Sequence, residues 1–467
     1  MMTEVDFAVI GGGSAGYSAA AEAAKLGLQT VCIDGGMEVG GLCILRGCMP
    51  SKTLLESANR FLTLRRAQEF GLSAGHLGFD AETIRRRKRS LIDGFADYRR
   101  AQLEKGSFDF VRARASFLSP HQLRLEGLDG SVREIGFRTA LISTGSELNV
   151  IDVPGLSEAG YLDSDAALDS DRVPSSVIIL GGGAIALEFA HFYNALGTKV
   201  TVLQRSPQFI KEADPDLADA LTNAYRRQGV EMISGTKLVA AERKEGGKTV
   251  RFIKDRQEKT VSADEIFYAL GRRPAISSLH LDAANIKLDG NAAVAVNERM
   301  QSSQPHIFAA GDVAGQFEVV HIAIEEALVA ARNAARWLKN EKLNPVDYRL
   351  RLFAMFSHPE LAFVGLTEKQ AADEGRRVRV ARYPFDDHGK SIIRGETEGL
   401  VKLIADANTH EIVGGGVVGP EAPELIHEIV VAMHFRAKAS DLAAIPHYHP
   451  TLSEIWTYPA EELATFE

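Results

Sequence analysis

The stretch that decides the fold is VDFAVIGGGSAG, from Val5 to Gly16. Its mostly apolar first half is typical of a buried strand, and the glycines that follow mark a turn. The alanine-rich run YSAAAEAAKLG then predicts a helix, and TVCID predicts a second strand that ends at Asp34. A strand, a G-x-G-x-x-G turn, a helix, a strand and an acid form the fingerprint of a dinucleotide-binding βαβ unit.

Each glycine of this turn has a physical role. Gly11 allows the tight turn, Gly13 lets the backbone approach a pyrophosphate, and Gly16 lets the helix pack closely on the strand. Unpaired N–H groups at the start of the helix attract phosphate. We therefore expect the first nucleotide to bind Gly11, Gly13, Ser14, Ala15 and Gly16, with Asp34 accepting from a ribose hydroxyl.

The same pattern occurs a second time. The run SVIIL leads into Gly181-Gly182-Gly183, a helix-like stretch and the strand TKVTVL. This strand is followed by Gln204-Arg205-Ser206 and not by an acid. An arginine suits a 2′-phosphate, so the pattern favours NADP, although NAD stays possible because Gln204 also suits a ribose. The expected contacts are Gly181, Gly183, Ala184, Ile185 and Arg205.

Further landmarks outline the domains. A predicted strand TALIS ends at Thr144-Gly145. The run FYALGRRP closes the second unit at Gly271 and Arg272. The run HIFAAGD places Asp312 at the end of another strand, where its carboxylate can accept from a sugar-like hydroxyl. Strand-like runs and the amphipathic PELIHEIVVAMHF then predict an α+β tail. We expect an α/β fold with domains at 1–150, 151–275, 276–345, which completes the first, and 346–467.

Length and charge narrow the class of protein. A chain of 467 residues is too long for one core. The net charge of −9 argues against a nucleic-acid partner, and the absence of a long apolar run argues against a membrane span. The start of the chain lacks a signal-peptide pattern, so we expect a cytoplasmic protein. The basic run Arg85–Arg89, with Arg99 and Arg100, is interpreted as a solvated helix face or, alternatively, as a docking patch for an acidic partner.

Two of the three cysteines, Cys43 and Cys48, lie in GGLCILRGCMPSK. In a reducing compartment, such a close pair is more often catalytic, redox-sensing or metal-binding than structural. A zinc site needs four ligands, and no second Cys or His pair with suitable spacing follows, so no metal site is predicted. Cys32, in the middle of a predicted strand, is expected to be a core residue.

These motifs, in this order, resemble the pyridine nucleotide-disulfide oxidoreductases, such as glutathione reductase, dihydrolipoamide dehydrogenase and mercuric reductase. The resemblance rests on both Gly-rich units, on C-x4-C-x-P-S-K up to Lys52, on S-T-G at Ser143 to Gly145, on A-x-G-D at Ala309 to Asp312, and on H-P-T-x-S-E at His449 to Glu454. It implies FAD in the first unit, a nicotinamide in the second, and a homodimer built largely through the last domain.

The resemblance also assigns roles. It implies that Cys43 and Cys48 form a redox-active disulfide beside the flavin, where Gly41 permits close approach, with Cys43 exchanging with the substrate. It places Lys52 near the reactive edge of the flavin, with Glu188 as its partner. It makes His449 the acid–base group for the cysteines of the partner subunit, oriented by Glu454, whereas His447 lacks the Pro-Thr context.

Several residues separate the members of this family. The chain lacks the C-terminal cysteines of mercuric reductases, and Ala21 and Glu22 stand where glutathione reductases carry arginines. The His-Pro-Thr-Leu-Ser-Glu ending is shared with dihydrolipoamide dehydrogenases, which usually show an acid in place of Gln204. Arg46 adds a positive charge beside the thiols. This charge either lowers a thiol pKa or meets an anionic substrate, or the side chain is simply exposed.

The leading expectation is an NADPH-preferring reductase of a small or lipoyl-type disulfide. One alternative is an NAD-dependent dihydrolipoamide dehydrogenase that works in the oxidative direction. The other alternative is a flavoprotein reductase of a quinone, oxygen or a metal ion, in which the cysteines are secondary.

Overall fold

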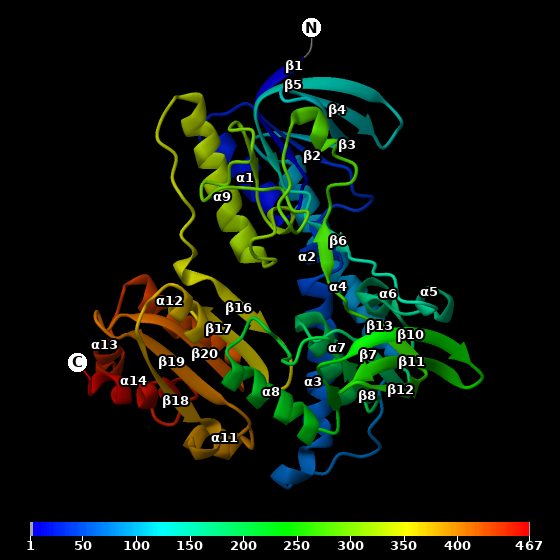
Figure 1. The fold of residues 1–467 in the computed structure, drawn as a ribbon, viewed down its shortest axis with the longest axis vertical. Coiled ribbons are helices and arrows are strands. Elements are labelled where there is room, and N and C mark those ends of the chain that lie inside the picture. Colours follow the sequence, from blue (N-terminus) through cyan, green and yellow to red (C-terminus); the bar gives the residue numbers. More distant parts are fainter. Residues whose placement is uncertain (1–2, 467) are drawn as a thin grey trace. The chain divides into compact units, whose positions relative to one another are not determined.

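The computed structural model describes residues 3–466 and divides into two compact units (Figure 1). The first unit contains Met1–Thr53, Arg86–Val150 and Gly271–Val346, and the second contains Leu54–Arg85, Ile151–Leu270 and Asp347–Glu467. The edges of these units at 150, 270 and 346 lie near the expected domain boundaries, and the division into four segments stays a prediction.

The first unit is built on a mixed sheet. Its parallel part has the order β3-β2-β1-β5-β15, and β4 pairs antiparallel with both β3 and β5. Strand β2 is buried along its whole length, as expected of a parallel strand that is covered on both faces. The bounds are β1 Thr3–Ile10, β2 Thr30–Asp34, β3 Asp109–Ser119, β4 Gln122–Gly127, β5 Val132–Ile142 and β15 Ile307–Ala309.

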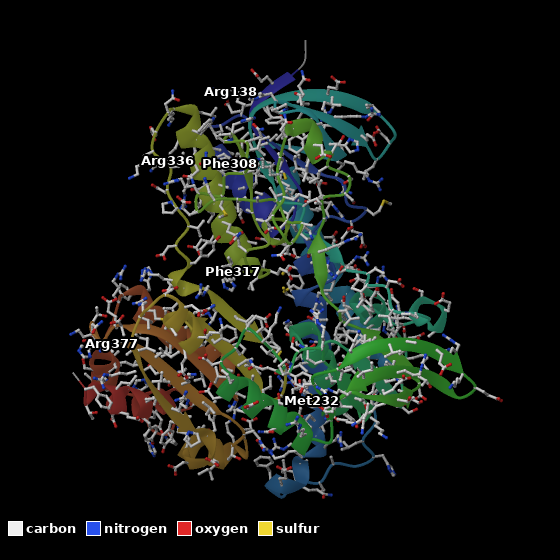
Figure 2. The ribbon with its side chains drawn as sticks, in the orientation of Figure 1. Arg138, Met232, Phe308, Phe317, Arg336 and Arg377 are labelled. Carbon is white, nitrogen blue, oxygen red and sulfur yellow. The ribbon has the colours of Figure 1, made fainter. Side chains whose placement is uncertain are left out.

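Two helices of the first unit, α1 (Ser14–Lys25) and α9 (Val320–Leu338), lie side by side (Figure 1). Their buried faces consist largely of alanine, which allows close approach of the two backbones. Phe308 on β15 is fully buried in the same unit (Figure 2). A short ribbon of β6 (Ser146–Leu148) and β14 (Arg272–Pro274) pairs the segment that ends near 150 with the segment that begins at 271.

Three further helices begin near the cysteines and the basic run. They are α2 (Gly41–Leu45), α3 (Cys48–Arg65) and α4 (Ala81–Glu104). The division between the units falls inside α3 and inside α4.

The second unit contains the repeated βαβ pattern. Its parallel sheet has the order β13-β7-β8-β9, and α7 connects β7 to β8. Met232 on β9 is part of its core (Figure 2). An antiparallel meander of β10, β11 and β12, which the sequence did not predict, follows α8 and β9. The bounds are β7 Ser176–Leu180, α7 Ala184–Ala195, β8 Lys199–Leu203, α8 Pro215–Arg227, β9 Glu231–Ile233, β10 Lys237–Lys244, β11 Gly247–Lys254, β12 Gln257–Ala263 and β13 Glu265–Tyr268.

The tail of the second unit is an antiparallel sheet of order β16-β17-β20-β19-β18 with helices packed on it. Trp456 is fully buried there and donates its indole N–H to the Leu425 carbonyl at 3.1 Å. The bounds are β16 Leu352–Met355, β17 Glu360–Gly365, α10 Glu368–Asp373, β18 Val378–Pro384, α11 Gly389–Arg394, β19 Leu400–Asp406, β20 Ile412–Gly419, α12 Ala422–His434, α13 Ala439–Ala444 and α14 Thr457–Ala464.

The fold is therefore α/β, with two nucleotide-binding βαβ patterns and an α+β tail, as the sequence predicts. Within residues 3–466, no helix has both the length and the apolar character that crossing a membrane requires.

Candidate redox site and nucleotide-binding turns

The first glycine turn follows β1 directly. Gly11 has a φ of +108°, and a Cβ on it would lie 2.4 Å from the Ser143 carbonyl oxygen. A Cβ on Gly16 would lie 1.7 Å from the carbonyl oxygen of Gly11. Only glycine avoids both clashes, so the turn packs the start of α1 directly against the ends of β1 and β5.

The start of α1 has the features of a phosphate site. Gly13 is its N-cap residue, and no side chain caps its N–H groups, which include those of Ser14 and Ala15. A Cβ on Gly41, whose φ is +71°, would lie 2.6 Å from the Gly13 Cα. The glycine backbone lets a ligand approach closely, and the uncapped N–H groups at the start of this 12-residue helix can donate to a pyrophosphate.

Asp34 ends β2 beside this turn. Its carboxylate accepts from the backbone N–H of Gly12 at 3.0 Å and of Gly36 at 2.9 Å. Because an ionised carboxylate offers about four lone-pair sites, Asp34 fixes the glycine turn and still has capacity for a ribose hydroxyl.

A second polar group of the first unit joins Asp312 to the β6–β14 ribbon. The Asp312 carboxylate accepts from Ser146 Oγ at 2.6 Å, and Arg272 donates from Nε to the same Oγ at 2.8 Å. Next to Asp312, the Gly311 N–H donates to the Glu326 carboxylate at 2.7 Å. Glu326 lies on α9 and is fully buried, and the sequence did not indicate its role.

Thr144 and Gly145 lead into the same ribbon. Thr144 Oγ1 donates to the Ala275 carbonyl at 2.7 Å, and Gly145 and Gly271 both have positive φ with open space around them. The structure therefore brings Thr144, Gly145, Gly271, Arg272 and Asp312 together around β6 and β14.

The second glycine turn repeats the geometry of the first. Gly181 has a φ of +121°, and a Cβ on it would lie 2.2 Å from the Ala269 carbonyl oxygen. A Cβ on Gly183 would meet nothing within 4 Å, and no side chain caps α7, which begins at Ala184 and Ile185. This helix start fits a second pyrophosphate.

Gln204 and Arg205 follow β8. Gln204 Oε1 accepts from the Arg205 backbone N–H at 3.0 Å, and the Arg205 side chain is exposed. The turn therefore presents an amide and a guanidinium where the first unit presents the carboxylate of Asp34.

The two cysteines lie at the start of α2 and α3. Gly40 and Gly41, both with positive φ, turn the chain into α2, which carries Cys43, and α3 begins at Cys48. Both are free thiols, half-buried, and they share a hydrogen bond.

The surroundings of Cys43 act on its thiol in opposite directions. The hydrogen bond from Cys48 and then burial raise the pKa of Cys43, and the charge of Lys52 on α3 opposes this. Arg46 is exposed and forms an ion pair with Glu38 at 3.3 Å. Lys52 is therefore a cation of the first unit that acts on the thiol pair.

Arg99 on α4 was expected to be solvated, but its guanidinium group is partly buried. Its guanidinium carbon lies 4.2 Å above the ring of Tyr17 on α1, and its Nε and Nη1 are buried with no hydrogen-bond partner among residues 3–466. Burial lowers the pKa of Arg99, and the charges of Tyr17 and Cys43 oppose this. Lys88 is only 5% exposed, so the solvated interpretation is wrong for these two members of the basic run.

His449 and Glu454 lie close together in the tail. The His449 Nδ1 is 3.1 Å and 3.2 Å from the two Glu454 oxygens. The imidazole is 79% exposed while the carboxylate is 9% exposed, so Nε2 is available to a second molecule. His447 makes a separate pair, with its Nε2 2.6 Å from Glu428.

Glu188 lies on α7 and is 5% exposed. It accepts from the Phe356 N–H at 3.1 Å. Lys52 belongs to the first unit and Glu188 to the second, so their pairing stays a prediction. Cys32, in contrast, is a fully buried residue of β2, and burial raises the pKa of its thiol.

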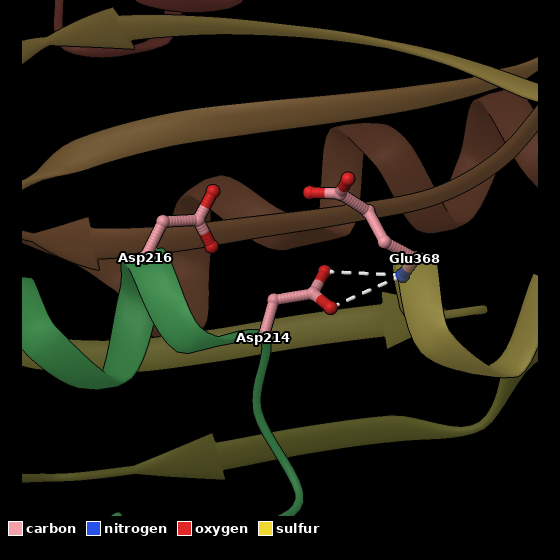
Figure 3. A group of neighbouring side chains, drawn as sticks. All are labelled: Asp214, Asp216 and Glu368. Atoms are coloured by element: carbon pink, nitrogen blue, oxygen red, sulfur yellow. Dashed lines mark hydrogen bonds between the residues drawn. The ribbon is translucent and has the colours of Figure 1, made fainter.

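An acidic cluster in the second unit was not visible in the sequence. Figure 3 shows the carboxylates of Asp214, Asp216 and Glu368 directed toward one another. One carboxylate oxygen from each lies within 4.8 Å of the others. The Lys402 ammonium lies 2.8, 3.0 and 2.6 Å from them and is almost fully buried. A cation of the protein itself therefore fills this cluster.

Two nucleotide-binding turns in one chain, with a dithiol near the first, define the class of flavin-dependent oxidoreductases that act on sulfur groups. The chain belongs to the pyridine nucleotide-disulphide oxidoreductase family: residues 5–327 match the model of that family, and residues 353–460 match its dimerisation domain. It is accordingly an enzyme that uses FAD and a pyridine nucleotide, and the dimerisation domain supports a homodimer.

Known relatives extend over the whole chain. Dihydrolipoyl dehydrogenase from Bacillus subtilis is 32% identical over 97% of each chain, and that from Thermus scotoductus is 34% identical over 99% of this chain and 98% of its own. The solved structure of LpdA from Mycobacterium tuberculosis has a TM-score of 0.87 at 26% identity and covers 99% of each chain. The Cu(II) complex of the HOCl-induced flavoprotein disulfide reductase RclA from Escherichia coli has a TM-score of 0.84 at 26% identity and covers 99% of this chain and 100% of its own.

Proposed function

We propose that this enzyme reduces a small or lipoyl-type disulfide through Cys43 and Cys48 and prefers NADPH as its electron donor. The observation that carries the proposal is the hydrogen-bonded thiol pair next to Gly41, which itself lies against Gly13 of the first nucleotide turn. Dinucleotide and thiols therefore have adjoining sites within one unit.

The first unit has the groups to hold FAD. The start of α1 would bind the pyrophosphate, and Asp34, Thr144, Gly145 and Asp312 would bind its polar groups. When bound, FAD supplies two-electron transfer between the pyridine nucleotide and the thiol pair. The positive charge of Lys52, with Glu188 as its proposed partner, would favour electron-rich states at this site.

The thiol pair supplies the two electrons for the substrate. The Cys43 thiolate attacks one sulfur of the substrate disulfide, the substrate S–S bond breaks, and a mixed disulfide forms. The Cys48 thiolate then attacks the Cys43 sulfur and releases the second substrate thiol. Two cysteine thiols have become one disulfide, and one substrate disulfide has become two thiols.

The protons are carried by a histidine. We assign this role to His449 of the partner subunit, whose Nε2 would protonate the leaving thiolate while Glu454 stabilises the imidazolium. The exposure of His449 and its two contacts with a nearly buried carboxylate support the assignment.

The preference for NADPH is supported by Gln204 and Arg205, which stand where a carboxylate would otherwise select NAD. Holoenzyme titrated anaerobically with NADPH or NADH should lose its flavin absorbance faster with NADPH. In the variant Arg205→Ala the ratio of the NADPH rate to the NADH rate should fall by roughly ten- to a hundredfold, because a hydrogen bond to a charged group contributes about 1.5–3 kcal/mol. The control Lys211→Ala, another exposed cation on the same connection, should keep it.

Two other functions have support of their own. The relatives named dihydrolipoyl dehydrogenase favour oxidation of a dihydrolipoyl group with NAD, and the Cu(II) complex of RclA favours a metal ion as electron acceptor. The NADH and NADPH titrations above bear on the first of these, and the variant Cys43→Ser separates the second from disulfide chemistry. It should lose turnover of every disulfide, whereas retained reduction of Cu(II) or a quinone would assign the main activity to the flavin alone. A cytoplasmic location and the absence of nucleic-acid partners stay predictions.

A further inference from the structure

His388 is a fully buried histidine next to the proposed acid–base pair. It lies between a short 3-10 turn and α11, far in sequence from His449. Its Nε2 is 3.5 Å from Glu454 Oε1, and Glu454 is the carboxylate that contacts His449 Nδ1. One nearly buried carboxylate therefore lies between two imidazoles, of which one is buried and the other exposed.

The contacts of His388 are compatible with the neutral tautomer that carries its proton on Nε2. Its Nδ1 lies 2.9 Å from the buried Ser391 Oγ, which can donate its hydroxyl proton to it. The proton of a neutral imidazole then resides on Nε2. Nε2 is buried, makes no hydrogen bond of good geometry among residues 3–466, and faces the Glu454 carboxylate and the Thr451 carbonyl.

The groups around His388 keep it neutral. Burial lowers its pKa, and a positive charge on His449 lowers it further, while Glu454 and Thr451 oppose this. The rings of Phe385 and Tyr458 also lie beside it, both edge-on at 6.3 and 6.4 Å between centroids. The titratable groups in contact with His388 include Glu454, His449 and Tyr458.

We propose that His388 is a positioning residue for the acid–base pair: its buried Nε2–H, 3.5 Å from Glu454 Oε1, attracts that carboxylate and favours the orientation that keeps His449 ready for proton transfer. A neutral donor suits this role, because it fixes the carboxylate without cancelling the charge that stabilises the His449 imidazolium. The inference rests on the proposed function, in which His449 carries the proton.

The test is a double-mutant cycle on the holoenzyme. His388→Leu should lower kcat for disulfide reduction about tenfold, which corresponds to about 1.4 kcal/mol, and leave the KM for NADPH unchanged, because groups in contact are energetically coupled. His388→Gln places an amide N–H donor near the position of Nε2 and should restore most of the loss. In a Glu454→Gln background, His388→Leu should cause no further loss, because His388 acts through that carboxylate.

Two results would overturn the inference: a wild-type kcat for His388→Leu, or an equal loss with and without Glu454. Ser391→Ala provides a smaller change in case His388→Leu does not fold. It releases the Nδ1 contact and should lower kcat several-fold; an unchanged kcat there also overturns the inference.

The control is His447→Asn. His447 also contacts a carboxylate, Glu428, and its loss should leave kcat unchanged. If the proposed acid–base role of His449 is wrong, the result is different, because His449→Ala would then keep full activity. Full activity of His449→Ala thus rejects the acid–base role, whereas an inactive His449→Ala with an unaffected His388→Leu rejects only the positioning role.

Discussion

Gly16 shows how strictly single residues determine the nucleotide turn. A Cβ at this position would lie 1.7 Å from a backbone oxygen, and no side-chain movement relieves a clash with backbone. We predict that Gly16→Ala yields protein without bound flavin and with a lowered melting temperature. The check is the ratio of visible to ultraviolet absorbance, together with thermal unfolding.

The matched control for Gly16 is Gly75→Ala. A Cβ on Gly75 meets nothing within 4 Å, and Gly75 is exposed, so flavin content and melting temperature should not change. A flavin-replete Gly16→Ala enzyme would show that the close packing of α1 on β1 is not required.

Glu360, at the start of β17, is a carboxyl group with an unusual pKa. Burial, and after it the charge of Glu421, raises the pKa of Glu360 to about 8 from an ordinary value of 4.5. Between these pH values the folded state binds a proton that the unfolded state does not. Stability should therefore fall as pH rises from about 4.5 to about 8.

Glu360→Gln tests this pH dependence. The variant should be more stable than wild type above about pH 8, and its urea midpoint should fall less between about pH 5 and pH 8. The exposed Glu461→Gln is the control and should follow wild type. Identical pH profiles for Glu360→Gln and wild type would contradict the raised pKa.

At the scale of elements, the carboxylates around Lys402 connect α8, α10 and β19. Burial raises the pKa of Asp216, but the hydrogen bonds and charges of Arg382 and Lys402 together lower it below its ordinary value. Lys402→Met removes the central cation and leaves three carboxylates close together. Breaking a buried ion pair in this way costs about 3–5 kcal/mol.

Urea unfolding of Lys402→Met should reveal this loss. Lys369→Met is the comparison, because Lys369 pairs with Asp373 at 2.7 Å while 83% exposed. Such a surface pair contributes about 1 kcal/mol or less. Equal unfolding midpoints for the two variants would mean that the cluster adds nothing to stability.

The glycine motifs allow both βαβ patterns to be predicted, but the ends of the helices less well. The first helix begins at Ser14, earlier than the predicted Tyr17, because residues of the glycine turn form its first turn. The meander of β10 to β12 carries no motif, and its strands mix exposed and buried residues without regular alternation. Pattern analysis therefore has little to detect there.

The predicted site follows the same logic. Cys43 and Cys48 are close in sequence, so their spacing indicates a pair, and the resemblance to the family pairs His449 with Glu454. Arg99 above Tyr17, and His388 beside Glu454, are brought together only by the fold. No short pattern marks such residues, since each looks like an ordinary surface arginine or histidine until its neighbours are known.

For the whole molecule, the proposed homodimer determines whether each site is built from one chain or from two. The tail exposes large apolar side chains, among them Val431, Phe435, Ile445 and Tyr448, as a dimerisation domain requires. If His449 serves the partner subunit, then mixed dimers of Cys43→Ser and His449→Ala chains contain one complete site.

Refolding the two inactive variants together tests this arrangement. About a quarter of wild-type activity should return, because half of the dimers are mixed and each has one working site. Each variant refolded alone is the control and should stay inactive. No recovery in verified mixed dimers would place histidine and cysteines of one site in the same chain.

The first unit is assembled from three separate segments, and its β15 strand pairs with β5 only after residues 151–270 have been made. During translation, a nascent chain that has emerged only to residue 270 has β1, β2 and β5 but neither α9 nor β15. Its sheet keeps an unpaired edge and an uncovered apolar face, which are the features that chaperones recognise and that promote aggregation. The first unit of this enzyme is therefore the first to emerge from the ribosome, but it completes its sheet only after most of the chain has been made.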